Sequence, residues 1–197
     1  MDEINGLQDN TMNKRYRLVF SGSGGQGVIT AAIILAEAAV LYENRNAVQT
    51  QVYGAAARGG STRSDVIISD TTIKYPKVNQ PNVLICLTQE AYTKYASIIR
   101  PGGTLLIDSR FVKVQRKVDA VQYELEMYQH VMEKIGKPIV FNICVLGAVI
   151  GLTSVVGLGA IEKVLEKRLA KPLIDINRQA LKLGFELSRS ERKVDFK

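Results

Sequence analysis

Hydrophobic and polar positions along this chain repeat with two different periods. Short apolar runs bounded by glycine, proline or asparagine indicate buried strands, and longer stretches with apolar residues three or four positions apart indicate helices. The predicted strands are Tyr16–Phe20, Ala47–Val52, Ser64–Ser69, Val83–Leu87, Thr104–Asp108 and Pro138–Phe141. The predicted helices are Gln26–Glu43, Gln89–Ile99, Val121–Ile135, Asn142–Gly151, Ala160–Leu169 and Leu173–Leu187.

The order of these elements predicts the fold class. Apolar strands interleaved with amphipathic helices are typical of an α/β fold, here a three-layer, Rossmann-like open sheet that is mainly parallel and has helices on both faces. A length of 197 residues suits one domain of this kind. We therefore expect a single domain over residues 14–197, preceded by a polar, flexible leader at residues 1–13.

A glycine-rich segment follows the first predicted strand directly and leads into the first predicted helix. Glycine allows backbone turns that other residues avoid, and the free amides at a helix N-terminus attract anions. The segment is therefore a candidate binding site for an anionic cofactor. Its candidate residues are Gly22, Gly24, Gly25, Gln26 and Gly27.

The spacing of these glycines matches the dinucleotide-binding fingerprint, which also requires an acidic residue at the end of the second strand. The second predicted strand ends in Gln51, Val52 and Tyr53, and Glu43 falls before it. The carboxylate that would bind a ribose is therefore missing from its expected position. A dinucleotide site, another kind of anion site and a purely structural turn remain open.

A second loop, Tyr53–Ser61, follows the second predicted strand and supplies four more candidate residues: Arg58, Gly59, Gly60 and Ser61. An arginine offers a fork of donors suited to a carboxylate or phosphate, and glycines let a backbone approach a ligand closely. Ligands on parallel sheets bind at the carboxyl ends of strands, so the two loops could face one crevice. A surface turn with a solvated arginine is the alternative. RNA-binding segments repeat an arginine-glycine-glycine triplet many times, and the single triplet at Arg58–Gly60 does not support RNA binding.

Composition narrows the class of protein. With 46% hydrophobic and 23% charged residues, and no long apolar stretch free of charge or glycine, the chain is typical of a soluble globular protein. Residues 1–13 lack the apolar core of a secretory signal. We expect a cytoplasmic protein with no membrane partner.

The net charge of +7 is typical of a protein that binds nucleic acid, but the distribution of the basic residues is not. One basic group on a predicted helix alternates with Glu162 and Glu166, a pattern typical of a solvated face or of a docking surface for an acidic partner. We therefore expect no nucleic-acid partner. The two basic groups are Lys113, Arg116 and Lys117, and Lys163, Lys167, Arg168 and Lys171.

Few side chains suggest catalysis or metal binding. Cys86 and Cys144 lie in apolar runs and read as buried small hydrophobic residues, and two cysteines are too few to hold an iron–sulfur cluster. The single histidine, His130, lies on a charged amphipathic stretch. We predict no catalytic residue and no metal site in this chain.

Several short motifs, taken in order, resemble the gamma subunit of 2-oxoacid:ferredoxin oxidoreductases. Each motif alone is weak, but the ordered set covers about Tyr16 to Ser109, and a further run extends it towards the C-terminus. The stretch from Thr50 to Asp70, with Lys74–Val78, is most similar to the 2-oxoglutarate branch, and the indolepyruvate, pyruvate and branched-chain versions remain possible. The motifs are Phe20–Val28, Tyr53–Gly54, Arg58–Ser61, Ile68–Asp70, Tyr75–Val78, Gly102–Gly103, Ile107–Ser109 and Asn142–Ala148.

The resemblance implies a gamma-type catalytic domain that takes part in oxidative decarboxylation of 2-oxoglutarate to succinyl-CoA, with electrons passed to ferredoxin or flavodoxin. It also implies alpha, beta and delta-type companion subunits that carry thiamine diphosphate, magnesium and iron–sulfur clusters, so that this chain carries no cofactor and is inactive alone. The two glycine loops would then contact the phosphates of coenzyme A or the companion subunits, or preserve packing. The competing hypothesis is a free-standing Rossmann-like regulatory module that binds a nucleotide.

Overall fold

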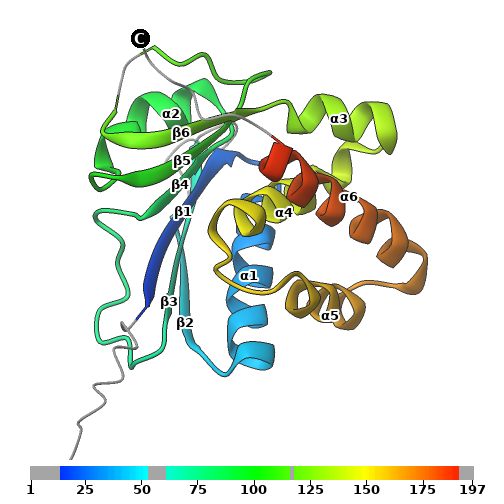
Figure 1. Ribbon diagram of the computed structural model, residues 1–197, viewed down its shortest axis with the longest axis horizontal. Helices are drawn as coiled ribbons and strands as arrows, with labels where there is room; N and C mark the ends of the chain where they lie inside the picture. Colours follow the sequence, from blue (N-terminus) through cyan, green and yellow to red (C-terminus); the bar gives the residue numbers. More distant parts are fainter. Residues whose placement is uncertain (1–13, 53–60, 116–117, 191–197) are drawn as a thin grey trace, which may run out of the picture.

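The structure is a computed structural model and describes residues 14–52, 61–115 and 118–190. Within these residues the strands form one six-stranded sheet in the order β2-β3-β1-β4-β5-β6 (Figure 1). The predicted leader at residues 1–13 lies outside the described residues. The strands are β1 Arg15–Ser23, β2 Asn46–Val52, β3 Ser61–Ser69, β4 Val83–Cys86, β5 Gly103–Asp108 and β6 Ala120–Leu125.

Strand directions make the sheet mixed but mainly parallel. β1, β4, β5 and β6 pair in parallel with one another, whereas β3 runs antiparallel to both of its neighbours, β1 and β2. β2 therefore points the same way as β1. The carboxyl ends of all strands except β3 meet at one edge of the sheet, which is where ligands of such folds bind.

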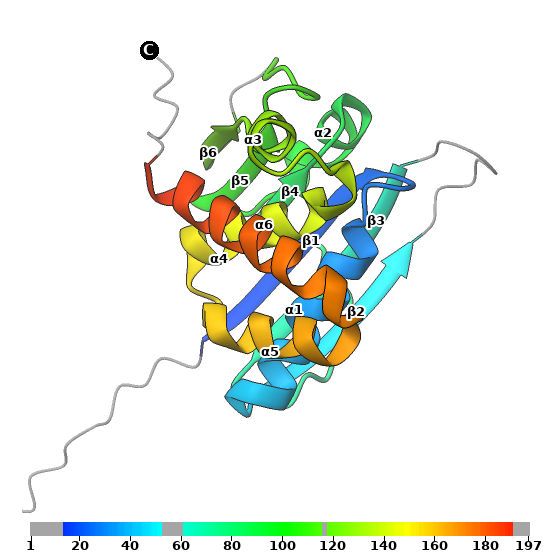
Figure 2. The ribbon, with the colours of Figure 1, turned by 90° about the vertical axis from the view of Figure 1, so that its right-hand side faces the viewer.

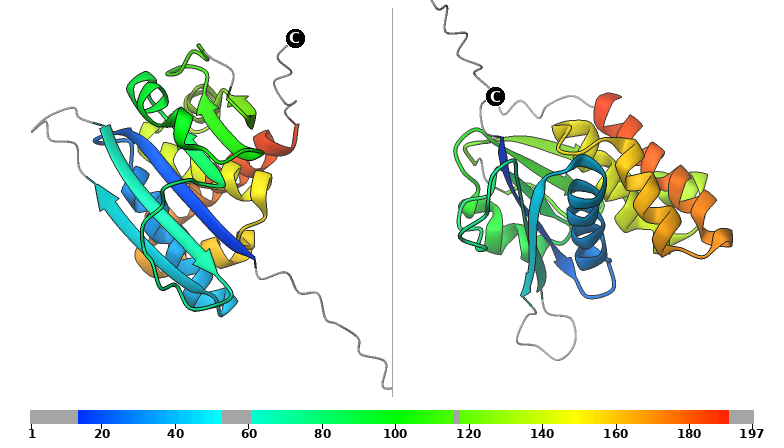
Figure 3. Two further views of the ribbon diagram at one scale, coloured as in Figure 1. Left: turned by 90° about the vertical axis from the view of Figure 1, so that its left-hand side faces the viewer. Right: turned by 90° about the horizontal axis from the view of Figure 1, so that it is seen from below.

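Helices cover both faces of the sheet unequally. α1, α4, α5 and α6 form a thick layer on one face, and α2 lies on the other (Figures 1 and 2). The segment between β3 and β4 runs along the α2 face, where Val78 joins the core (Figure 3). The helices are α1 Val28–Glu43, α2 Gln89–Tyr95, α3 Met127–Lys134, α4 Phe141–Thr153, α5 Leu158–Arg168 and α6 Lys171–Ser190, with short 3-10 turns Ala96–Ile98 and Pro138–Val140.

The central strands are apolar because both of their faces are buried. In β1, Leu18 and Phe20 pack into the core under α1 and α4, and Val19 between them packs into the core under α2. Helix α4 is apolar around its whole circumference, with every residue from Ile143 to Ile150 buried. These patterns confirm the predicted α/β fold with helices on both faces.

Glycines bring α4 and α6 together along their length. A Cβ atom added at Gly147 would lie 2.0 Å from the carbonyl oxygen of Leu181, and one added at Gly184 would lie 1.8 Å from the carbonyl oxygen of Cys144. The two backbones are thus in direct contact, a spacing that only glycine allows. This crossing fixes α4, whose N-terminal turn faces the glycine loop of β1.

Two of the predicted elements were wrong. The first half of the predicted helix Val121–Ile135 is strand β6, and the helix begins at Met127. β6 is an edge strand in which Val121 and Tyr123 stay half-exposed. Over six residues its hydrophobic pattern therefore fits both the two-residue period of a strand and the 3.6-residue period of a helix. The predicted strand Pro138–Phe141 is a 3-10 turn that leads into α4, consistent with the preference of proline for the first turn of a helix.

Candidate functional site

The glycine loop lies at the carboxyl edge of the sheet, between β1 and α1, as predicted (Figure 2). β1 extends through Gly22 to Ser23, so the loop proper is shorter than its motif. Ser23 pairs with Ser61 at the start of β3, and the amide of Leu87 donates to the carbonyl of Ser21, 2.9 Å away. The loop is therefore bordered by the ends of two neighbouring strands.

The side chain of Gln26 holds the loop to its neighbours. The Ser23 amide donates to Gln26 Oε1 at 2.8 Å, and Gln26 Nε2 donates to the carbonyl of Leu87 at 3.1 Å. Both ends of the side-chain amide are thus engaged in closing the turn and in joining β1 to the end of β4. A side chain used in this way supports the shape of the loop and has little left to offer a ligand.

Gly22 and Gly27 are required by close packing. A Cβ at Gly22 would lie 2.5 Å from Gln26 Oε1, and one at Gly27 would lie 2.7 Å from the side chain of Asn142 on α4. Gly27 also has φ +70°, in the left-handed region that favours glycine. These two glycines serve the architecture of the loop.

Gly24 and Gly25 form an open tip between them. A Cβ at either position would meet nothing within 4 Å, and both residues are exposed. Next to the tip, α1 begins with Gly27 as a cap that offers no side chain, and no acidic residue lies in its first turn. The first amides of a helix have no acceptor within the helix and carry a partial positive charge. The tip and this helix end together suit an anionic group such as a phosphate.

A pocket of about 290 Å³ adjoins the loop and is lined by residues of the loop, α1, the Pro138–Val140 turn, α4, α5 and α6. Its walls are mainly aliphatic, with polar groups from Thr30, Asn142 and Asn177. Ile139, 80% exposed, and Leu173, 45% exposed, lie on its rim. Its lining is Gly25, Gln26, Gly27, Thr30, Ile34, Pro138, Ile139, Val140, Asn142, Ile143, Leu165, Leu169, Leu173, Ile176 and Asn177.

The second predicted loop is described only at its margins. Arg58, Gly59 and Gly60 lie outside the described residues, and Ser61 is the first residue of β3. Ser61 is 4% exposed, and its hydroxyl accepts a hydrogen bond of 3.4 Å from Lys94 Nζ. The end of β2 and the start of β3 lie at the same edge as the glycine loop. The prediction that both loops start from one edge is confirmed for these flanking residues.

Asp108, which belongs to the motif Ile107–Ser109, is a buried carboxylate at the same edge of the sheet. Its oxygens accept hydrogen bonds from the amides of Arg110, at 3.0 Å, and Tyr128, at 2.8 Å. Burial raises the pKa of Asp108, and the hydrogen bonds from these two amides act in the opposite direction. The carboxylate anchors the N-terminus of α3 beside the end of β5, so its role is structural.

The remaining candidate groups for chemistry are buried or engaged. Burial raises the pKa of the thiols of Cys86 and Cys144 to about 12, so both are inert, as their apolar surroundings predict. His130 Nδ1 forms a 2.9 Å hydrogen bond with the carbonyl of Glu126. Across the described ranges, no three histidine, cysteine, aspartate or glutamate side chains are grouped to hold a metal ion, and no helix is long and apolar enough to cross a membrane.

A mixed α/β sheet with a glycine turn after its first strand is shared by many proteins, so comparison with known sequences decides the family. The family model for pyruvate ferredoxin/flavodoxin oxidoreductase matches residues 17–187, and the chain belongs to this family. The 2-oxoglutarate synthase subunit KorC of Methanocaldococcus jannaschii is 43% identical over 180 residues, which cover 90% of this chain and 95% of the relative.

Solved structures share the fold. The gamma subunit of a keto/oxoacid ferredoxin oxidoreductase from Geobacter sulfurreducens PCA superposes with a TM-score of 0.82 at 40% identity, over 90% of this chain and 98% of that chain. A 2-oxoglutarate:ferredoxin oxidoreductase from Magnetococcus marinus shares the fold with a TM-score of 0.82 at 20% identity. There the match covers 92% of this chain but 32% of that chain. The same fold thus occurs as a separate chain and within a longer one.

Proposed function

We propose that this chain is the gamma subunit of a 2-oxoglutarate:ferredoxin oxidoreductase, which oxidatively decarboxylates 2-oxoglutarate to succinyl-CoA. The observation that carries the proposal is the 43% identity to a 2-oxoglutarate synthase subunit over nearly the whole of both chains. The family match and the Geobacter gamma subunit support the same class of enzyme subunit. The sensor hypothesis is less well supported, because the second strand ends without an acidic residue to bind a ribose.

Thiamine diphosphate, magnesium and iron–sulfur clusters are proposed to lie on companion subunits. The chain has only two cysteines, and both are buried in the core, so they cannot serve as ligands of a four-iron cluster. The proposed partners are alpha, beta and delta-type subunits, with ferredoxin or flavodoxin as the acceptor of the complex. The single-domain division at residue 14 and the cytoplasmic location stay predictions, and limited proteolysis and cell fractionation would test them.

Within the complex, the tip of the glycine loop is proposed to bind phosphate groups of coenzyme A. The residues present fit such a group, because Gly24 and Gly25 leave the backbone uncovered beside the free amides of α1. Gly22, Gln26 and Gly27 would hold the tip in place. Arg58, Gly59, Gly60 and Ser61 stay in the proposal as a second contact with coenzyme A or with a companion subunit.

Co-expression with the companion subunits tests the proposal. The purified complex should reduce a viologen dye when supplied with both 2-oxoglutarate and coenzyme A, and faster than with pyruvate or 2-oxoisovalerate. The isolated chain should be colourless and inactive. Turnover by the isolated chain, saturable NAD or ATP binding by it, or failure to associate with the companion subunits would contradict the proposal.

Arg58→Ala in the assembled complex tests the second loop separately. Loss of a charge-assisted hydrogen bond should weaken use of coenzyme A or 2-oxoglutarate by roughly 10- to 100-fold with assembly intact. Release of the chain from the complex would instead make Arg58 an interface residue. An intact complex with unchanged kinetics would remove Arg58 from the site. Size-exclusion chromatography followed by steady-state kinetics on one preparation distinguishes these results.

A further inference from the structure

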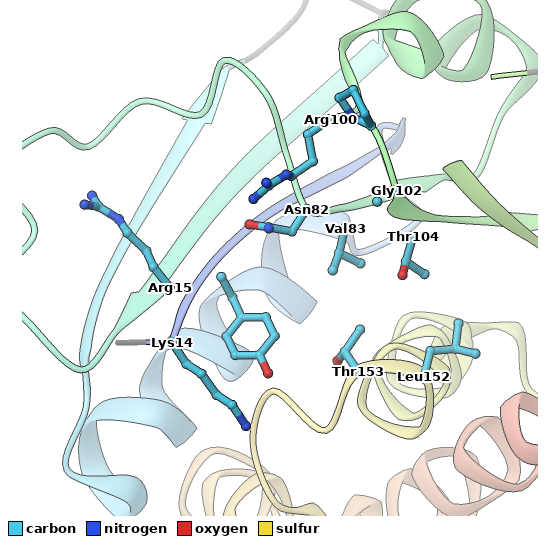
Figure 4. Close-up of a pocket in the computed structure, with 12 residues that line it drawn as sticks. Lys14, Arg15, Asn82, Val83, Arg100, Gly102, Thr104, Leu152 and Thr153 are labelled. Carbon is cyan, nitrogen blue, oxygen red and sulfur yellow. The ribbon is translucent and has the colours of Figure 1, made fainter. Parts of the chain in front are cut away.

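A second concave region lies at the amino edge of the sheet, opposite the glycine loop. Two hollows of about 460 and 730 Å³ adjoin there and share Arg100 and Pro101 in their linings. The first is lined by the starts of β1, β4 and β5, together with the C-terminal end of α4 (Figure 4). Because strands β1, β4 and β5 are parallel, this region lies a full strand length away from the proposed coenzyme A contact.

All charged side chains that line the two hollows are basic. Lys14, Arg15 and Arg100 line the first hollow, and Arg17, Lys77 and Arg100 line the second. No aspartate or glutamate of the described ranges contributes to either lining. We call these five residues the basic rim. They come from three distant parts of the sequence, so the charge groups seen along the sequence do not include them.

No side chain of the basic rim is paired with an acidic side chain within the described ranges, although the backbone amide of Lys14 donates a 3.1 Å hydrogen bond to Asp70 Oδ2. Arg45 pairs with Asp70, Arg63 with Asp65, and Arg168 with Glu37. The ion pairs found within the described ranges include no rim residue. Arg15 Nε is buried and has no hydrogen-bond partner within the same ranges. A buried donor without a partner is costly and is normally satisfied by some other group.

The rim arginines also repel one another. The pKa of Arg17 is lowered, first by burial and then by the positive charges of Arg15 and Arg100. In the isolated chain this repulsion is uncompensated. Carboxylates placed against the rim would remove the repulsion and add charge-assisted hydrogen bonds, which arginine forms well with the planar carboxylate group.

The charged ends are spread over the region and do not converge on one point. In Figure 4 the side chains of Lys14 and Arg15 extend in opposite directions from the start of β1, and Arg100 reaches towards β1 from the other side. A single phosphate would need converging donors. An extended segment with several acidic side chains fits a spread arrangement, and the lining also contains Tyr16 and Tyr75, a residue type enriched with arginine in protein interfaces.

We propose that the basic rim is a docking surface for an acidic segment of a companion subunit, with the identity of that companion resting on the proposed function. The surface holds the amino edge of the sheet against the complex and leaves the carboxyl edge free to face the substrate side. It uses the five rim residues and contributes nothing to the reacting groups.

Charge reversal at the exposed part of the rim tests this surface. The rim variant is Arg100→Glu with Lys77→Glu, and the matched control is Lys113→Glu with Lys182→Glu. All four side chains are exposed, and each pair changes the net charge equally. Both variants should keep the thermal unfolding midpoint of the wild-type chain. Their affinity for the purified companion subunits is then measured at several salt concentrations.

We expect the rim variant to bind the companion subunits about tenfold or more weakly, and the control to bind like the wild type. The wild-type affinity should fall with salt, and that of the rim variant should fall less. A carbodiimide, which joins amines to carboxylates, should link Lys14 or Lys77 to an aspartate or glutamate of a companion, as identified by mass spectrometry.

Equal affinity of the rim variant and the control would overturn the inference. So would binding of inorganic pyrophosphate to the isolated chain that is lost in the rim variant while assembly stays unchanged, because the rim would then be a small-anion site. If the wild-type chain fails to bind the companions at all, the proposed function itself fails. If the wild type and the rim variant assemble equally well and have the same turnover rate, the proposed function stands and only the docking surface is rejected.

Discussion

The two ends of the glycine loop and its tip are alike in sequence but differ in their surroundings. At the ends, Gly22 and Gly27 lie where a Cβ would overlap neighbouring side chains, at 2.5 Å and 2.7 Å. At the tip, Gly24 and Gly25 face open space. The same residue type therefore serves packing at the ends and leaves the backbone most accessible in the middle, at Gly24 and Gly25.

This difference separates stability from function within one motif. Substitutions at the ends should unfold or distort the loop, and a loss of activity there would say little about binding. A substitution at Gly24 should leave the fold intact, so its effect on activity reports contact with a ligand, whereas Gly25 has φ +91° and a side chain there would strain the backbone.

The largest expected effect is on the reactivity of the two buried thiols, Cys86 and Cys144. Cys86 ends β4, where it pairs with Ser21 of β1, and burial raises the pKa of the thiols of Cys86 and Cys144 to about 12. At pH 8 only about one thiol in 10⁴ would be ionised, so native protein should react negligibly with Ellman's reagent. Both thiols should react once urea unfolds the chain. Rapid reaction of the native protein would show that these thiols are accessible to solvent and that the core around them is not closed.

Gly27→Ala should destabilise the chain by about 1–3 kcal/mol, because alanine would be forced to φ +70° and into the side chain of Asn142. Urea unfolding measures the change. Adding Asn142→Ala removes the overlap with Nδ2 and Cγ of Asn142, but the Cβ atom of residue 142, 2.8 Å away, and the backbone strain both remain, so the double variant should recover only a small part of the loss. A Gly27→Ala chain as stable as the wild type would mean that this end of the loop is not packed.

Gln26→Ala should cost about 1–3 kcal/mol, because the Ser23 amide and the Leu87 carbonyl both lose their partner. Gln49, which donates to Ser64 Oγ on the outer strand pair, offers a matched control. Gln49→Ala should cost less, since the Gln49 side chain makes one such bond where Gln26 makes two. Equal losses for the two variants would argue against the bracing role of Gln26.

Gly24→Ala should change the free energy of unfolding by less than about 0.5 kcal/mol, since its Cβ would meet nothing within 4 Å. This is the smallest expected effect on stability and the counterpart of Gly27→Ala. The two variants should be measured in the same urea series. A large loss for Gly24→Ala would remove the distinction between tip and ends.

Local patterns were enough to predict most of the fold. β1, β4 and β5 are apolar runs bounded by turn residues, and their buried positions on both faces leave little ambiguity. β6 was missed because an edge strand with a half-exposed face resembles an amphipathic helix over six residues. The Pro138–Val140 turn was missed because an apolar run beside proline fits either a strand or the start of a buried helix.

The site was less predictable because contacts between distant residues define it. The motif located the loop, but Gly27 owes its role to Asn142, 115 positions later in the chain. The basic rim joins Arg15, Lys77 and Arg100, which no local pattern connects. The sequence does place three basic residues, Lys14, Arg15 and Arg17, at the start of an apolar strand, but nothing local links them to Lys77 or Arg100.

The most direct test of the site is the KM for coenzyme A of the assembled complex carrying Gly24→Ala. If the tip of the glycine loop binds phosphate groups of coenzyme A, this KM should rise about tenfold, while the KM for 2-oxoglutarate and the stability of the chain stay unchanged. An unchanged KM for coenzyme A in a stable, fully assembled complex would contradict the account and leave the glycine loop as a purely structural turn.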